Sequence, residues 1–219
     1  PELLRFLLCV CVTVLVGVSP AAAGVCYGCR FFSFLDPQPE RWLRTEADLA
    51  DRLAAARARR TGDHDCLHLL SGGKDSTYAL YQLVEQGWNV HALTLDNGFI
   101  SEGAKENVRR SIADLGITHE FATTDAMNEI FRDSLDRYSN VCQGCYKTIY
   151  TIAVARARER GIPAIVTGLS RGQFFETRLV PHQFESGRFD PDEIDQTVLE
   201  ARRVYHQTPD AVTELLPEQ

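Results

Sequence analysis

Positively charged residues are scarce in this chain. Its 23 lysine and arginine residues are outnumbered by 30 aspartate and glutamate residues, so the net charge over 219 residues is −7. Because nucleic acid is bound mainly through basic surfaces, this balance excludes a wholesale nucleic-acid-binding surface, although it leaves room for a local patch. Arginines do cluster at 57–60 and at 156–160, and both clusters are typical of solvated helix faces.

Apolar stretches of membrane-spanning length, internal repeats and low-complexity tracts are also missing. The apolar run Phe6–Val16 is shorter than the roughly 20 residues that a spanning helix needs. Arg5 before it and Ala21–Ala23 after it imitate a secretory signal with a small-residue cleavage site. We favour a buried strand or a cysteine knuckle over a signal peptide for this stretch.

Cysteines are few, and most of them are paired in sequence. Cys66 lies in an apolar stretch, which indicates a small core residue. The other six form three close pairs: Cys9/Cys11, Cys26/Cys29 and Cys142/Cys145. Close pairs favour metal binding or redox-active thiols over structural disulfides. The first two pairs would make a four-thiolate zinc site within residues 1–35, although the first has one intervening residue where zinc knuckles usually have two.

The strongest functional signal is the stretch Ser71–Thr77. An apolar run at 66–70 precedes it and indicates a buried strand, while residues 78–86 have a helical period that ends at Gly87. A strand-to-helix turn aims backbone N–H groups and the positive end of a helix dipole at one point, which makes an anion site. Its glycines let the backbone approach a phosphate, and its lysine adds positive charge. Its aspartate suits such a site as a helix cap or as a ligand of a divalent cation.

Two common nucleotide-binding motifs do not fit this stretch. In the P-loop pattern His68 would have to be glycine and Asp75 serine or threonine, and a G-x-G-x-x-G pattern is absent. Ser71–Thr77 instead resembles the SGGKDS signature of the PP-loop ATP pyrophosphatases, also called adenine nucleotide alpha hydrolases. The resemblance implies that ATP and Mg²⁺ bind here, that ATP is cleaved to AMP and pyrophosphate, and that Lys74 and Asp75 are catalytic. The implied ATP-binding residues of the loop are Ser71, Gly72, Gly73, Lys74, Asp75, Ser76 and Thr77.

The remaining pattern predicts an α/β fold. Strands are expected over 66–70, 89–95, 118–122 and 163–167, and helices over 45–60, 78–86, 102–115, 126–138 and 146–160. Strands that alternate with helical crossovers make a parallel sheet with helices on both faces, Rossmann-like, here within residues 45–180. Residues 181–219 are predicted to be a C-terminal helical extension, with a helix over 190–205.

Ligands of such sheets bind at the carboxyl ends of the strands. Ser71, Asp96 and Gly168 each follow a predicted strand, so we expect them to share one pocket. The family resemblance implies that Thr94 and Asp96 line the adenine and ribose pocket, and that Thr167 and Gly168 also contact the nucleotide. Simple turn chemistry is the alternative interpretation of Asp96.

Cys142 and Cys145 form a second constellation. They open a helix, where the dipole favours a thiolate, so we expect lowered thiol pKa values. Residues 142–147 resemble the matching segment of PP-loop tRNA thiolases and of N-acetyl sugar amidotransferases, and Gly24–Arg30 resembles the leading cysteine-rich segment of the amidotransferases. The resemblance implies that Cys142 and Cys145 are catalytic or hold Zn²⁺ or an iron–sulfur cluster, with Cys26 and Cys29 as further ligands. Leu169–Gly172 stands where the thiolases carry His-x-Asp-Asp.

Three functional hypotheses remain open. The preferred one is ATP-dependent activation of a carbonyl or amide oxygen of an N-acetyl sugar, followed by nitrogen transfer with ammonia from a separate glutaminase. The second is sulfur insertion into a tRNA base or a small molecule, with Cys142 and Cys145 as sulfur carriers or cluster ligands and a separate sulfur donor. The third is a nucleotide-binding module without catalysis. Because ATP is scarce outside the cytosol, we expect a cytoplasmic protein. We expect the acceptor to be a small molecule rather than tRNA. A homodimer is one arrangement that the protein could adopt.

Overall fold

The computed structural model describes residues 46–169, 196, 199–200 and 203–216. Residues 51–219 form one compact unit, and the other unit, Pro1–Ala50, is described only over its last five residues. The predicted knuckle with Cys26 and Cys29 therefore lies outside the described residues, as does most of 181–219. Within the part that is described, no helix is both long and apolar enough to cross a membrane.

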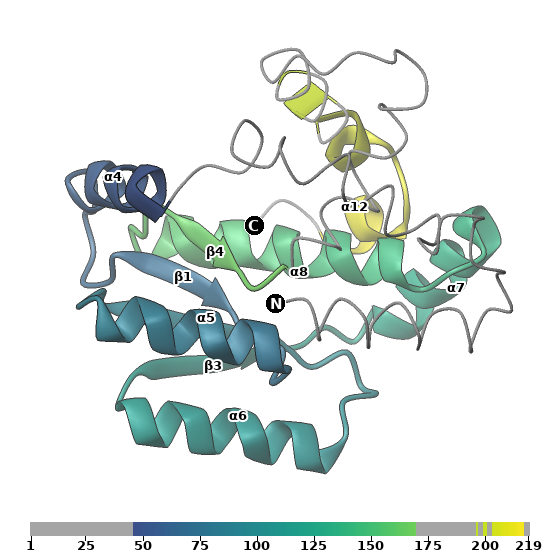
Figure 1. The fold of residues 1–219 in the computed structure, drawn as a ribbon. Helices are drawn as coiled ribbons and strands as arrows, with labels where there is room; N and C mark the ends of the chain where they lie inside the picture. The colour runs from purple at the N-terminus through teal and green to yellow at the C-terminus, as the bar shows by residue number, and fades with distance from the viewer. Residues whose placement is uncertain (1–45, 170–195, 197–198, 201–202, 217–219) are drawn as a thin grey trace, which may run out of the picture. The chain divides into compact units, whose positions relative to one another are not determined.

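A four-stranded parallel sheet carries the core of the larger unit. Its strands are β1 (Cys66–Leu69), β2 (Val90–Leu95), β3 (Thr118–Ala122) and β4 (Ile165–Thr167), in the order β3-β2-β1-β4. In register, Leu67 on β1 pairs with His91 on β2 and with Ile165 on β4. Because every pairing is parallel, the carboxyl ends of the strands meet at one edge (Figure 1). The predicted α/β class is confirmed.

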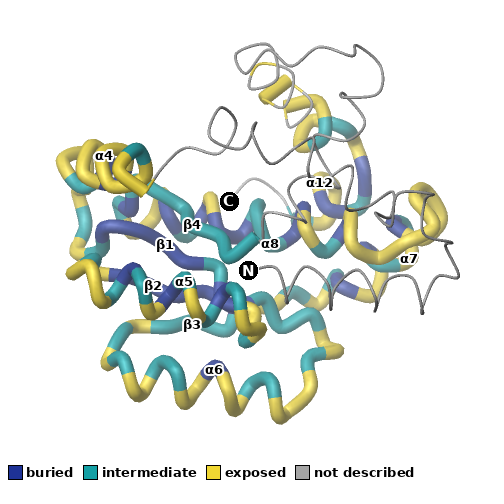
Figure 2. Tube along the Cα trace, in the orientation of Figure 1, coloured by how far each residue is buried: buried dark blue, intermediate teal, exposed yellow. Residues whose placement is uncertain are grey.

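Helices cover both faces of this sheet, as the sequence pattern predicts. The helices with defined bounds are α4 (Glu46–Arg57), α5 (Lys74–Glu85), α6 (Glu102–Leu115), α7 (Met127–Tyr138), α8 (Cys142–Glu159) and the short α12 (Ala211–Leu215), of which α7 and α12 pack against each other. Helices α5 and α6 pack on one face and α8 packs on the other (Figure 1). The strands alternate accordingly, since Cys66 and Leu70 pack with α5 while Leu67 packs with α8. Figure 2 shows the resulting buried centre, with the outer surfaces of the helices exposed.

Local signals set the ends of these helices. The Ser101 hydroxyl accepts a hydrogen bond from the Ala104 N–H and caps α6, and Gly116 ends that helix in the left-handed conformation. The bounds predicted for α6 are therefore confirmed. Helices α5 and α8 instead begin one turn earlier than predicted, at Lys74 and Cys142. Their first turns are mainly polar or small, so the apolar period used to find the helices does not include them.

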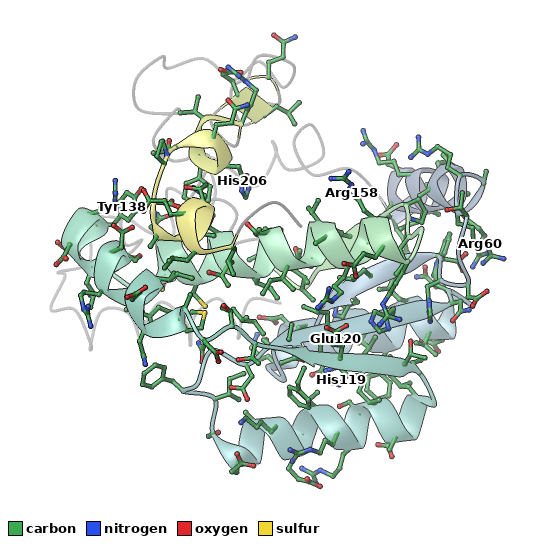
Figure 3. The ribbon with its side chains drawn as sticks, turned by 180° about the vertical axis from the view of Figure 1, so that it is seen from behind. Arg60, His119, Glu120, Tyr138, Arg158 and His206 are labelled. Atoms are coloured by element: carbon green, nitrogen blue, oxygen red, sulfur yellow. The ribbon has the colours of Figure 1, made fainter. Side chains whose placement is uncertain are left out.

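The edge strand β3 carries polar residues on both faces. Glu120 accepts a 2.9 Å hydrogen bond from Arg156 of α8, which ties the strand to that helix. His119 lies on the opposite face, and its Nε2 is 2.9 Å from the hydroxyl of Thr94 (Figure 3). The two faces of β3 are therefore held by different neighbours, a helix on one side and a strand residue on the other.

A buried carboxylate joins α4 to the start of β1. Asp65 accepts hydrogen bonds from Arg57 at 2.7 Å, from Arg60 at 2.6 Å and from the Asn89 N–H at 2.9 Å. Burial by itself raises the pKa of Asp65, but these hydrogen bonds outweigh it and hold the pKa below its ordinary value of 3.8. The ion pairs are thus one anchor of the amino-terminal edge of the sheet.

A second buried ion pair fastens the C-terminal residues to α8. Lys147 lies in the second turn of α8 with 1% of its surface exposed, and its Nζ is 2.6 Å from Asp210 and 2.8 Å from the Thr208 carbonyl. Asp210 also caps α12, because its other oxygen accepts the Thr213 N–H. The Asp210 carboxylate therefore caps the start of α12 and holds this helix against α8.

Asp65→Asn should lower the free energy of unfolding by about 2–3 kcal/mol at pH 7, because Arg57 and Arg60 lose their anion. A carboxylate with a depressed folded-state pKa stabilises the protein above its unfolded-state pKa, and this contribution is lost as the pH falls through the folded-state value. The difference from wild type should therefore shrink below about pH 4. Urea unfolding at both pH values measures it. Asp114→Asn, an exposed aspartate on α6, is the control, and an equal effect there would contradict the role of Asp65.

Lys147→Met should destabilise the protein by about 3–5 kcal/mol, because it leaves the carboxylate of Asp210 buried without a cation. Arg137→Met is the matched control. Arg137 pairs with Asp133 at 2.7 Å near the surface, where loss of the cation should change stability by less than about 1 kcal/mol. Thermal or urea unfolding measures both variants. Equal effects in the two would show that burial of the Lys147 pair is unimportant.

Candidate functional site

The loop Ser71–Thr77 follows β1 at the carboxyl edge of the sheet, and its last four residues form the first turn of α5. Ser76 is the centre of its hydrogen bonds. The Ser76 Oγ accepts the Ser71 N–H at 3.2 Å, lies 2.9 Å from the Ser71 Oγ and donates to the Gly73 carbonyl at 3.1 Å. These bonds hold both ends of the loop together around one buried hydroxyl.

Two glycines are required by the geometry of the loop. Gly72 has a φ of +76°, and a Cβ there would lie 3.1 Å from the Ala104 carbonyl oxygen of α6. Gly168 follows β4, and a Cβ on it would lie 2.3 Å from the Cα of Ser76. Two strand ends are therefore packed against the same helical turn, and Gly168 is placed beside the loop as the sequence predicts.

The start of α5 has the character of an anion site. Gly73 is the N-cap and offers no side-chain cap, so no side chain at that position covers the positive end of the helix dipole. Lys74 is 88% exposed by side chain and Asp75 is 44% exposed, with their Nζ and Oδ1 atoms 2.5 Å apart. Both side chains lie at the mouth of the loop, where a phosphate and its cation would approach.

Residues at the end of β2 lie at the same edge. The buried Thr94 hydroxyl donates to the Leu70 carbonyl at 2.6 Å and contacts His119, so it joins neighbouring strands. Asp96 accepts from Lys105 at 2.7 Å and from the Gly98 N–H at 3.1 Å. These two hydrogen bonds lower the pKa of Asp96 and outweigh its partial burial. The carboxylate is thus ionised at neutral pH and has a lysine beside it.

A thiol from α8 reaches this edge. The Cys145 Sγ lies 3.8 Å from the side-chain nitrogen of Asn97, which follows Asp96 in the turn after β2. Cys142 is exposed and Cys145 is partly buried. The structure therefore brings one of the two predicted thiols next to the residues that follow β2.

The expectation of a lowered thiol pKa is wrong for Cys145. Burial raises the pKa of this thiol, and the hydrogen bond from Asn97 offsets that effect only in part. The helix dipole acts within one turn, but the loss of water around the sulfur is the larger effect. Burial also raises the pKa of Cys66, to about 12, which fits the prediction of an inert core thiol.

Three residues near the site have weak sequence signals. Asn97 and Lys105 are ordinary choices for a turn and a helix surface, so only the fold shows that they face Cys145 and Asp96. His68 was visible as a polar residue in an apolar strand, and the structure places it directly below the first turn of α5. Of these three residues, only His68 could have been suspected from the sequence, because it is a polar residue in the apolar strand before the loop.

The metal ligands were predicted to be Cys26, Cys29, Cys142 and Cys145. The first two lie outside the described residues. Among the residues that the structure describes, no group of three or more histidine, cysteine, aspartate or glutamate side chains could hold an ion. Zinc and iron–sulfur clusters normally take four protein ligands, so Cys142 and Cys145 do not complete such a site by themselves.

Comparisons with known proteins identify relatives of this chain. A family model described as "Thiamine biosynthesis protein (ThiI)" matches residues 61–177. A 7-cyano-7-deazaguanine synthase of Methanoregula boonei is 35% identical over 69 residues, 32% of this chain and 32% of that protein. A probable tRNA sulfurtransferase of Methanothermobacter thermautotrophicus is 34% identical over 112 residues, 48% of this chain and 29% of that protein. The chain thus spans about a third of the length of these curated relatives.

Comparison with solved structures gives partial similarities. The NMN synthetase of Francisella tularensis has a TM-score of 0.45 and 17% identity, with 73% of this chain and 90% of that one covered. The NH3-dependent NAD synthetase of Campylobacter jejuni has a TM-score of 0.43 and 13% identity, with coverages of 78% and 89%.

The ThiI match covers more than half of the 219 residues. It includes the whole loop Ser71–Thr77 and both Cys142 and Cys145. This chain therefore belongs to the ThiI family, within the PP-loop or adenine nucleotide alpha hydrolase superfamily.

Proposed function

We propose that this protein uses ATP to activate an oxygen of a tRNA base and then replaces that oxygen with sulfur. The observation that carries the proposal is the position of Cys145. Its sulfur lies beside Asn97 in the turn after β2, and the loop Ser71–Thr77 follows the neighbouring strand β1 at the same edge. A thiol and an anion-binding loop at one edge are the parts that activation and sulfur transfer need.

The activation step explains the residues of the loop. A carbonyl oxygen is a poor leaving group, and transfer of AMP to it makes a good one. The acceptor oxygen bonds to the α-phosphorus of ATP while the bond to pyrophosphate breaks. The amides at the start of α5 and the exposed Lys74 would stabilise the charge on the departing pyrophosphate. Asp75 would hold Mg²⁺, which when bound supplies further positive charge to the phosphates.

The transfer step distinguishes sulfur from nitrogen. A persulfide donor would pass its outer sulfur to Cys142 and then to Cys145. That outer sulfur would bond to the activated carbon, and AMP would leave with the original oxygen. Attack of the Cys142 thiol on the Cys145 sulfur would then release the thiolated base and leave a disulfide between the two cysteines. The probable tRNA sulfurtransferase among the relatives supports this chemistry over the sugar amidotransferase preferred from sequence alone. The exposure of Cys142 and the partial burial of Cys145 also suit two roles, since an external donor can reach the first thiol while the second faces the site.

The choice of tRNA also revises the order of acceptors expected from the acidic net charge. A chain with a charge of −7 can bind RNA only through a local basic surface. The relative's name supports tRNA, and the fold supplies the carboxyl edge at which a base would meet ATP.

Lys74→Ala should abolish pyrophosphate release from ATP, with a loss of at least about 100-fold, because the charge on the leaving group loses its nearest cation. The fold should be intact, since Lys74 is almost fully exposed. Pyrophosphate release in the presence of tRNA and sulfide measures the effect. Arg110→Ala, an exposed cation on α6 outside both arginine clusters, is the control and should keep wild-type turnover. Unchanged release by Lys74→Ala would remove the loop from the mechanism.

Cys145→Ser should abolish formation of thiolated tRNA but leave the fold and ATP binding intact, because the variant keeps its loop and loses only the sulfur beside Asn97. Mass spectrometry of digested tRNA measures the product. Cys66→Ala is the matched control, since that thiol is fully buried and should have no part in transfer.

Full thiolation by Cys145→Ser would contradict the sulfur role. Pyrophosphate release that depends on ammonium and an N-acetyl sugar, with none from sulfide and tRNA, would replace thiolation with nitrogen transfer.

A further inference from the structure

A histidine is buried beneath the candidate ATP loop. His68 lies in β1 between Leu67 and Leu69, has none of its surface exposed, and faces α5. The strand otherwise consists of apolar residues and Cys66. A buried imidazole in a strand of this kind needs a compensating interaction, because it gives up its bonds to water.

Within the described residues the imidazole makes one hydrogen bond, and that bond goes to the loop. Its Nε2 lies 2.9 Å from the backbone carbonyl oxygen of Ser76. A carbonyl only accepts, so Nε2 carries the proton and donates. Burial lowers the pKa of His68 despite this bond, so the ring is neutral and Nδ1 has no proton. Nδ1 is buried and has no hydrogen-bond partner within the described residues.

This bond reaches the residue on which the loop depends. The Ser76 hydroxyl joins Ser71 to Gly73, and the Ser76 backbone packs against Gly168 at the end of β4. His68 adds a third contact to Ser76, the hydrogen bond from β1 to its backbone carbonyl. The first turn of α5 is thus held from β1, from the loop and from β4, and the free amides of such a turn point out of the helix start.

We infer that His68 is a positioning residue of the phosphate site: its Nε2–H holds the Ser76 carbonyl and so fixes the direction of the first-turn amides of α5. This inference rests on the proposed function in one respect, namely that the loop binds ATP. His68 touches neither ATP nor the reacting atoms. It acts through Ser76, and its loss should weaken ATP binding by loosening the turn.

A purely structural role makes a different prediction. Leucine at position 68 would fill similar space, continue the apolar strand and remove the unpartnered Nδ1, so stability should change little or rise. A histidine kept only for packing would therefore be replaceable without effect on ATP. The orientation of the amides, in contrast, depends on the donor and should respond to its removal.

The test measures ATP affinity by calorimetry with a non-hydrolysable ATP analogue and Mg²⁺, on the full wild-type chain and its variants. His68→Leu should bind about tenfold more weakly, the effect of one lost hydrogen bond. His68→Gln should restore affinity to within about threefold of wild type, because its amide can donate to the Ser76 carbonyl. Melting temperatures separate loss of binding from loss of fold, and His68→Met repeats the apolar change if leucine fails to pack.

His91→Leu is the matched control. His91 is also buried in a strand and also has an unpartnered ring nitrogen, but it bonds to Thr118. This variant should bind ATP as wild type does. Unchanged affinity in His68→Leu, an equal loss in His91→Leu, or an equal loss in His68→Gln and His68→Leu would each overturn the inference. Wild-type protein that binds no ATP would overturn the proposed function together with it, and this outcome is visible before any variant is compared.

Discussion

The contact between Gly168 and the first turn of α5 places the end of β4 directly against the candidate phosphate loop. A side chain at Gly168 would occupy the space of Ser76 itself, with its Cβ 2.3 Å from the Ser76 Cα. Because the Ser76 hydroxyl also forms hydrogen bonds with Ser71 and Gly73, the position of Ser76 constrains the whole loop. The parallel sheet places the ends of β1 and β4 at one edge. The close packing of Gly168 on Ser76 then joins these two strand ends in one site.

The chemistry proposed for the protein depends on a second convergence at the same edge. The helix α8 crosses the opposite face of the sheet, and its first turn brings Cys145 to the residues that follow β2. Lys147, two residues later on the same helix, is held by Asp210 in a buried ion pair. Cys145 therefore lies on a helix that packs on the sheet and is also held by the ion pair to Asp210, while Cys142 remains exposed. A rigid edge with one sheltered and one exposed sulfur suits delivery of sulfur from outside to an activated substrate.

Much of the fold could be predicted from the sequence because its signals are local. The helix at 102–115 has both a serine cap and a terminal glycine, and its predicted bounds agree with the structure. Apolar runs identify β1, β2 and β4, and the bounds predicted for the more polar β3 also agree with the structure. Other features could not be predicted. The first turns of α5 and α8 have no apolar period, and the lowered pKa expected at Cys145 is reversed by burial that only packing creates.

What the sequence by itself determined is the identity of the loop and its position between a strand and a helix. Ser71–Thr77 carries its glycines, lysine and hydroxyls in one continuous stretch, so no distant contact is needed to recognise an anion site. The tertiary structure alone decided which distant residues serve that stretch. His68 and Asn97 act through contacts with other segments, and such contacts depend on strand order and helix packing, which no local pattern encodes.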